Sequence, residues 1–151
     1  MWPETQEKAE LEVSLLRQNV DCYRTLIDKS RHTEPDIIEI SALATFLHSF
    51  YTGVENIFKR IAIEIDEADP SGDRWHSDLL TAMSGPSAKR PAVISSELKA
   101  VLGKYLEFRH LFRHAYGFLL KWRRMDDLVL SADQALDELE TELRSFFADE
   151  R

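Results

Sequence analysis

The stretch "DIIEISALATFLHSFYTGVENIFKRIAIEI", residues 36–65, decides the fold. Its large apolar residues recur every three or four positions, at Leu43, Leu47, Phe50, Val54, Ile57, Ile61 and Ile65. This spacing places them along one side of a helix, and a pattern of this length is typical of a bundle helix with a packed seam. We therefore predict a helix over roughly residues 36–68, with Thr33 as its N-cap and Pro35 in its first turn.

Apolar stripes on either side of this helix predict further helices. The first covers roughly residues 4–29, and a short one lies in "RWHSDLLTAM", residues 74–83, between two loops that are rich in Pro, Ser and Gly. Another long helix is expected to start near Ser95 or Ser96 and to carry apolar residues as far as Leu119.

A last helix follows Ser131, whose spacing from Gln134 is that of a capping box. No strand pattern or internal repeat competes with these helices, and the two loops are too short to divide the chain. The predicted fold class is therefore all-α, an up-and-down helical bundle of four main helices plus a short one, in a single domain over residues 1–151.

Composition limits the function. Cys22 is the only cysteine, so an intrachain disulfide or a multi-cysteine zinc site is excluded. There is no long uncharged apolar run and the N-terminal stretch "MWPETQEKAELE" is acidic, so we expect neither a membrane span nor a secretory signal and favour the cytoplasm. Nothing in the sequence indicates a cofactor or a metal site.

The charge is unevenly distributed. The chain carries −8, but Lys99 to Arg124 holds seven basic residues and one acid, a net +6, so the remainder carries −14. A basic segment on an acidic body is a candidate anion site. The alternative is an ordinary solvated helix face.

Within this segment, Arg109 interrupts an apolar row. On an ideal helix Tyr105, Arg109, Phe112 and Tyr116 share one side. A guanidinium is costly to bury unless it is paired or faces a wet cleft. One alternative is that Arg109 pairs with an acid of the second helix such as Glu55.

Imidazole, guanidinium and phenol groups together suit RNA cleavage. Imidazole moves protons near neutral pH, guanidinium binds phosphate oxygens, and the RNA 2′-hydroxyl is an internal nucleophile that needs no metal. Arg109 and His114 are about 140° apart around an ideal helix, so one chain cannot present both to a small group unless the helix loosens near Gly117. Otherwise a second chain brings its own copies, and both readings favour a site at a homodimer interface.

The stretch "RHLFRHAY", residues 109–116, resembles the R-x4-H-x-Y motif of HepT-like ribonuclease toxins in the HEPN superfamily. "FYTGVENIFKRIA", "GDRWHSDLL" and "RPAVISSELKAVLGKYLEFRHLFRHAYGF" are also similar to segments of HepT-like proteins. The resemblance implies a HEPN-like α-helical dimer and a metal-independent endoribonuclease that acts on RNA. It also implies a partner, a minimal nucleotidyltransferase antitoxin that neutralises the toxin by adding AMP to the motif tyrosine. Whether the dimer assembles further with the antitoxin stays an open question.

By motif position the resemblance gives three residues catalytic roles. Arg109 would stabilise the transition state, His114 would be the acid/base group, and Tyr116 would be both a site residue and the AMPylation target. The sequence departs from the expected pattern at His110, often Asn or Asp in the superfamily, and at "LLKWRR", where an acidic residue is expected.

Other residues receive a supporting role or none. His110 and Arg113 are expected at the rim of the site, and a polar-aromatic line on the second helix can support it, formed by His48, Tyr51 and Glu55. Tyr116 fits core packing equally well. Trp75 and Trp122 are interpreted as packing anchors, and no role is assigned to His32 or His76.

Two other functions compete with the ribonuclease. The first is a non-catalytic HEPN helical protein that binds a nucleotidyltransferase, which the acidic body favours because RNA binding depends on neutralised phosphates. The second is a nucleotide-binding helical module.

Overall fold

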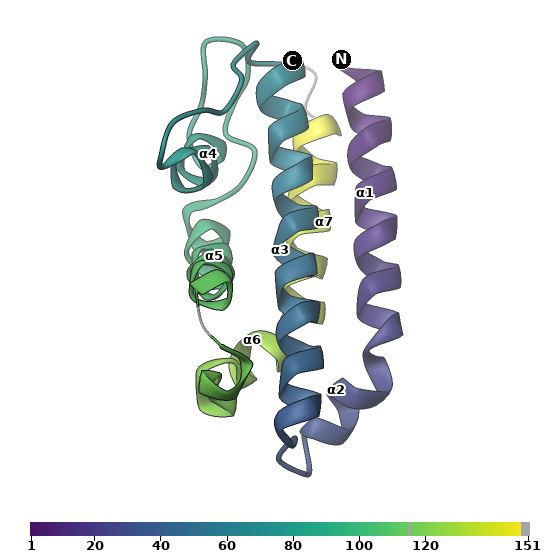
Figure 1. The fold of residues 1–151 in the computed structure, drawn as a ribbon. Helices are drawn as coiled ribbons and strands as arrows, with labels where there is room; N and C mark the ends of the chain where they lie inside the picture. The colour runs from purple at the N-terminus through teal and green to yellow at the C-terminus, as the bar shows by residue number, and fades with distance from the viewer. Residues whose placement is uncertain (115, 149–151) are drawn as a thin grey trace.

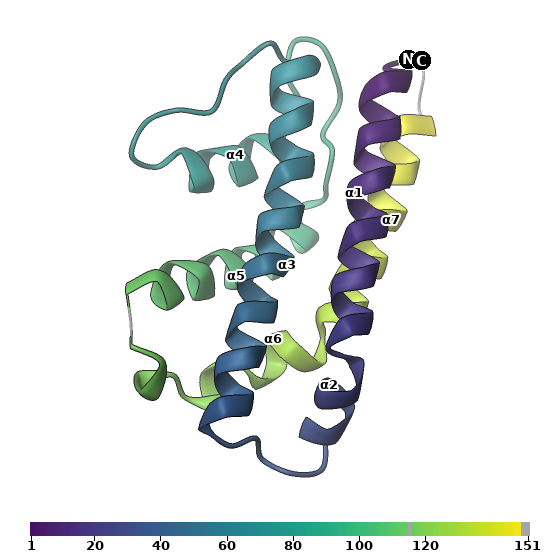
Figure 2. The ribbon, with the colours of Figure 1, turned by 45° about the vertical axis from the view of Figure 1, so that its right-hand side comes forward.

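The computed structural model describes residues 1–114 and 116–148, and these form helices connected by loops. Three long helices, α1 (Pro3–Cys22), α3 (Ile37–Glu64) and α7 (Ala132–Ala148), lie side by side (Figures 1 and 2). The short helix α4 (Trp75–Met83) and the long helix α5 (Ser96–His114) lie together on one side of α3. The predicted all-α bundle is confirmed, with the difference that α5 crosses α3 instead of running along it (Figure 2).

Helix α3 is the centre of the bundle because its apolar seam is buried along its whole length. Leu43, Phe50, Val54 and Ile61 have no exposed surface. By length and composition α3 could also cross a membrane, but half of its most apolar window is buried inside the protein, as in the core helix of a bundle. At Gly53 an added Cβ would lie 2.5 Å from Leu16 Cδ2, so glycine is what allows α1 to approach α3 this closely.

The start of α3 differs from the prediction. Asp36, and not Thr33, is the N-cap: its carboxylate accepts from the Glu39 N–H at 2.8 Å, and Glu39 Oε1 accepts from the Asp36 N–H at 3.0 Å. This reciprocal capping box satisfies two backbone donors that the first turn of a helix otherwise leaves free. Pro35 precedes the cap and is buried.

The first predicted helix is divided into two. α1 ends at Cys22, Tyr23 has φ −103° and ψ 3°, and α2 (Arg24–Ser30) continues in a new direction (Figure 2). The Tyr23 ring packs against Phe46 at 5.3 Å between centroids, and Arg24 pairs with Asp133 at the start of α7. These tertiary contacts bend the chain where the apolar pattern alone runs on.

A buried ion pair fixes the loop that joins α4 to α5. The guanidinium of Arg90 donates to both carboxylate oxygens of Asp66, at 2.9 and 2.8 Å, and to the carbonyls of Gly85 and Pro91, each at 3.0 Å. The Arg90 side chain is 1% exposed. The loop is therefore attached to the end of α3, and this holds α4 and α5 in place.

Helix α5 begins as predicted and ends earlier than predicted. The Ser95 hydroxyl accepts from the Leu98 N–H at 3.0 Å and donates to Glu142 of α7 at 2.9 Å, so this residue caps α5 and ties it to the bundle. The helix ends at His114 and is followed by a short 3₁₀ turn, η1 (Gly117–Leu119), which lies against the first turns of α3.

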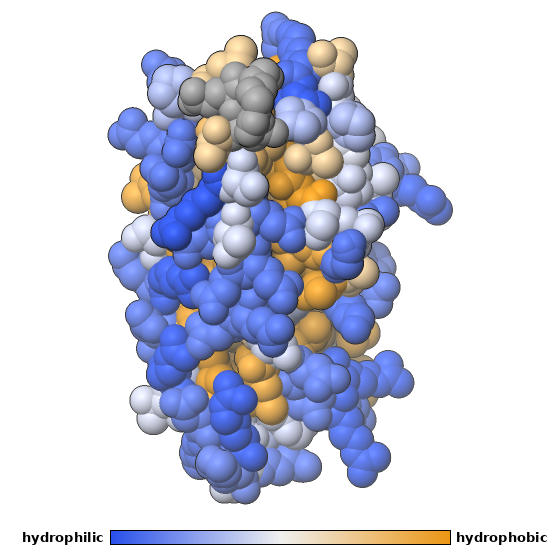
Figure 3. All heavy atoms as spheres, turned by 180° about the vertical axis from the view of Figure 1, so that it is seen from behind, coloured by the Kyte–Doolittle hydropathy of each residue, from blue (hydrophilic) through white to orange (hydrophobic). Residues whose placement is uncertain are grey.

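The chain returns to the bundle through η2 (Trp122–Arg124) and α6 (Asp126–Leu130). The Ser131–Gln134 capping box is not formed, because the Ser131 N–H bonds to the Asp127 carbonyl and Gln134 donates to Glu138. The face seen from behind Figure 1 is largely hydrophilic, with smaller hydrophobic areas between the polar side chains (Figure 3).

Candidate functional site

A groove with a volume of about 1290 Å³ runs between α4 and α5. One wall comes from residues 72–81 and the other from one side of α5. Only two acids line it, Asp73 and Glu107. Basic and imidazole side chains outnumber them: Arg74, His76, Lys99, Lys104, Arg109, His110, Arg113 and His114. On a protein that carries −8, this groove is a local basic site.

Helix α5 presents its groove residues as a stripe at helical spacing. Lys99, Gly103, Glu107, His110 and His114 follow one another three or four positions apart, so they share one side of the helix. The His110 and His114 rings meet edge to face, 4.8 Å between centroids, and both residues are exposed. Two imidazoles are thus available to a molecule bound in the groove.

Arg109 lies between this stripe and α3 and is half-buried. Its Nε is buried and has no hydrogen-bond partner among the described residues, and the same holds for the Tyr51 hydroxyl. Burial raises the pKa of Tyr51, the Glu55 charge raises it further, and the Arg109 charge lowers it. The proposed Arg109–Glu55 ion pair is not formed within the described residues, although both charges shift the pKa of the Tyr51 hydroxyl, in opposite directions.

Glu55 is instead paired with His76. The distance between His76 Nδ1 and Glu55 Oε2 is 2.6 Å, and Glu55 is 4% exposed. The imidazole stacks on Trp75 at 3.7 Å between centroids, and Lys59 Nζ lies 5.3 Å from the centre of the Trp75 ring. His76 lines the groove. No spacing in the sequence indicated a role for His76. The signal that could have indicated one was Glu55, an acidic residue within the apolar stretch of α3.

The polar-aromatic line predicted on α3, formed by His48, Tyr51 and Glu55, lies on the side of α3 that faces the arginines of α5. Burial lowers the pKa of His48, and the positive charges of Arg109 and Arg113 lower it further, while Glu55 opposes them. The His48 ring packs against Phe112 at 5.4 Å, and its buried Nδ1 has no partner among the described residues. His48, Tyr51 and Glu55 therefore lie close to the arginines of α5 and to His76, and their supporting role stays a prediction.

Tyr116 does not continue the helix. Residue 115 lies outside the described residues, and Tyr116 has the extended dihedral angles φ −69° and ψ 147°. Its side chain is 74% exposed and stacks on Phe118 at 5.7 Å. The prediction that Tyr116 and Leu119 extend the apolar row of α5 is wrong, because α5 ends at His114 and the helical register stops there. Tyr116 therefore does not share a helical side with Arg109, although the spacing on an ideal helix predicted that it would.

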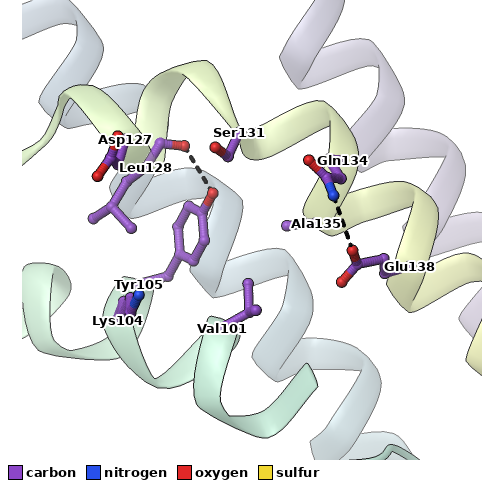
Figure 4. Close-up of a pocket in the computed structure, with 9 residues that line it drawn as sticks. All are labelled: Val101, Lys104, Tyr105, Asp127, Leu128, Ser131, Gln134, Ala135 and Glu138. Atoms are coloured by element: carbon purple, nitrogen blue, oxygen red, sulfur yellow. Dashed lines mark hydrogen bonds between the residues drawn. The ribbon is translucent and has the colours of Figure 1, made fainter. Parts of the chain in front are cut away.

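A second, smaller pocket of about 250 Å³ lies between α5 and the α6–α7 segment (Figure 4). Tyr105 reaches across it and donates a hydrogen bond to the Leu128 carbonyl at 2.7 Å. Tyr105 is 2% exposed, so this contact holds α6 against α5. Among residues 1–114 and 116–148, no group of three or more metal-ligating side chains was found.

The described residues thus form an all-α bundle in which a helix that bears arginine and histidine is set across the core. In the comparison with family models, the family described as HepT-like protein matches residues 42–149, from α3 to beyond the end of α7. The chain therefore belongs to the HepT-like family, which is in general nuclease-related. No curated protein and no solved structure matched.

Proposed function

We propose that this protein is a metal-independent endoribonuclease toxin that binds single-stranded RNA in the groove between α4 and α5. One observation carries the proposal: Arg109, His110 and His114 open onto the same groove, together with Lys99 and Lys104. Cationic side chains supply the sequence-independent part of RNA binding by neutralising phosphates. The imidazoles supply the groups that move protons.

In the proposed reaction a base in the groove takes the proton of the 2′-hydroxyl, the 2′-oxygen bonds to the adjacent phosphorus, and the bond from phosphorus to the 5′-oxygen breaks. Arg109 stabilises the charge that develops on the phosphate oxygens, for which a planar guanidinium is well suited. His114 donates the proton to the leaving oxygen. The products are a 2′,3′-cyclic phosphate and a 5′-hydroxyl.

We also propose that the active form is a homodimer in which two copies of the motif share one cleft. Exposed apolar residues gather at the end of the motif and just beyond it, at Tyr116, Phe118 and Leu119. They lie beside the start of α3, where Ile37 and Ile38 are exposed. Contiguous exposed apolar surface is typical of protein contacts. Light scattering should give a dimer at micromolar concentration, and a stable monomer would contradict this assembly.

Neutralisation is proposed to come from a minimal nucleotidyltransferase that adds AMP to Tyr116. The exposed phenol is accessible to another protein's active site. Because Tyr116 lies beyond α5, the added group is not expected to sit on the same helical face as Arg109, and it would block RNA or the dimer contact from the end of the groove.

The second candidate is a non-catalytic HEPN protein that binds a nucleotidyltransferase. The net charge of −8 favours it, because most of the molecule would repel RNA. Growth and cellular RNA integrity separate the two functions. Expression of the wild type should arrest growth and fragment RNA, and His114→Ala should abolish both effects. Equal growth of the two strains with intact RNA would favour the partner protein.

A further inference from the structure

His76 and Glu55 form a carboxylate–imidazole pair that the motif does not include. With Glu55 assigned as an ionised carboxylate, which can only accept a hydrogen bond, His76 Nδ1 is assigned as the donor in the 2.6 Å contact with Glu55 Oε2. This fixes the tautomer and leaves Nε2 as the free nitrogen. Nε2 has no hydrogen-bond partner among the described residues and is not buried. His76 lines the same groove as Arg109 and His114.

The pair is not needed to attach α4 to the bundle. Leu79, Leu80 and Met83 of α4 are at most 5% exposed, and the Met83 carbonyl accepts from the N–H groups of Val93 and Ile94. Burying a glutamate among the apolar residues of α3 is costly, and an apolar residue would fill that position more cheaply. A chemical role for the imidazole explains why this acid is there.

His76 and Arg109 also lie over neighbouring turns of α3. Glu55, which holds His76, follows Tyr51 by one turn, and Arg109 lies between Tyr105 and Phe112 of α5, whose rings pack against Phe50 and His48 of α3. Because both residues line the same groove, we expect the ribose next to a phosphate bound at Arg109 to lie toward His76.

We propose that His76 is the general base of this groove and that Glu55 is its positioning residue. The inference rests on the proposed ribonuclease function and deepens it. Nε2 takes the proton of the 2′-hydroxyl while the 2′-oxygen bonds to phosphorus and the bond from phosphorus to the 5′-oxygen breaks. The leaving 5′-oxygen takes a proton from the His114 imidazolium. The Glu55 carboxylate stabilises the His76 imidazolium, and exchange with water resets both imidazoles.

Isosteric variants of the full-length protein test this assignment. His76→Asn keeps a donor where Nδ1 lies but has no group at Nε2, and Glu55→Gln keeps the acceptor but removes the charge. His32→Asn, in the exposed loop before α3, is the matched control. The substrate is a pool of short single-stranded RNAs of random sequence, and the matching DNA pool, which lacks the 2′-hydroxyl, measures binding without cleavage.

The expected result is a loss of cleavage without a loss of binding. His76→Asn should cleave about 10²-fold more slowly or worse under single-turnover conditions, the usual contribution of a general base. Its affinity for the DNA pool should change by less than about threefold, and its thermal midpoint should stay near that of His32→Asn. Glu55→Gln should fall between His76→Asn and the wild type in rate.

Two outcomes would overturn the inference, and they are distinct. If His76→Asn cleaves at the wild-type rate while Arg109→Ala and His114→Ala do not cleave, the base assignment is wrong and the ribonuclease function stands. If the wild type cleaves no RNA, both proposals fail together.

Chemical rescue distinguishes a proton-transfer role of His76 from a purely structural one. Imidazole added to His76→Ala should restore part of the rate, whereas pyrazole, of the same size but far less basic, should not. Equal rescue by both would mean that the ring only fills space, and would remove the proton-transfer role.

Discussion

His76 Nδ1 lies 2.6 Å from Glu55 Oε2, and this contact joins the first turn of α4 to the buried face of α3. The two residues are 21 positions apart, and His76 opens onto the groove that also holds Arg109 and His114. The groove thus combines a motif on one helix with an imidazole from another, and both are positioned by α3.

The Arg90–Asp66 pair should dominate the stability of the α4–α5 region. Arg90→Met leaves a carboxylate without its buried partner, which costs about 3–5 kcal/mol in comparable cases. Lys89→Ala removes an exposed pair with Glu67 and should cost less than about 1 kcal/mol. Urea unfolding of both variants measures the difference, and equal losses would mean that the buried pair is not what fixes this loop.

Stability should fall in mild acid because of His48. Its pKa is lowered in the folded protein, chiefly by burial and then by Arg109 and Arg113, from an ordinary value of 6.5. As the pH falls, His48 therefore binds a proton in the unfolded chain before it does so in the folded protein. The free energy of unfolding decreases as the pH falls from about 7 through 6.5 toward the pKa of His48 in the folded protein.

The comparison of His48→Gln with the wild type checks this dependence. The variant should have a flatter profile between about pH 7 and pH 5.5, measured by urea unfolding. Glu39 and Glu64 have lowered pKa values, and their contribution is lost only as the pH falls below their ordinary value of 4.5, so they act in a separate range. Identical slopes for variant and wild type above pH 5.5 would exclude His48 as the cause.

Gly103 offers a way to fill the groove without harming the fold. A Cβ at this position meets no atom within 4 Å, so Gly103→Ala should stabilise α5 by about 0.5–1 kcal/mol. Gly103→Leu should fold equally well but place a branched side chain in the groove and weaken RNA binding. Thr141→Leu, on the exposed side of α7 and away from the groove, is the control. Unchanged RNA affinity in Gly103→Leu would mean that RNA binds elsewhere.

Tyr116→Phe should separate modification from activity. If the antitoxin adds AMP to the exposed phenol, coexpression with a minimal nucleotidyltransferase encoded beside this chain should raise the intact mass of the wild type by one or more AMP groups. The mass of the phenylalanine variant should stay unchanged. The variant should then escape neutralisation. Suppressed toxicity without any mass change would show that the antitoxin acts by binding alone.

The apolar pattern of the sequence predicted the features of the fold that depend on regular local spacing. The seam of α3 and the starts of α4 and α5 follow from local spacing and capping, and the R-x4-H-x-Y pattern directed attention to the helix that lines the groove. The break at Tyr23 depends on contacts with Phe46 and Asp133, which are remote in sequence. The end of α5 at His114 was missed because apolar residues continue at helical spacing beyond it, although Tyr116 and Leu119 are exposed.

His76 illustrates what a single sequence cannot show. Neither its spacing nor its neighbours distinguish it from His32, which lies in an exposed loop. Its significance comes from the contact with Glu55, which joins residues 21 positions apart and depends on how α4 packs over α3.

The most direct test of the central claim is cleavage of single-stranded RNA by the purified protein in excess EDTA. The wild type should produce fragments with 2′,3′-cyclic phosphate and 5′-hydroxyl ends. Arg109→Ala and His114→Ala should remain folded by circular dichroism and cleave at least about 10²-fold more slowly, the usual effect of losing a charge-stabilising donor or a proton-transfer group. Folded Arg109→Ala protein with full activity would contradict the claim that this groove is a ribonuclease site.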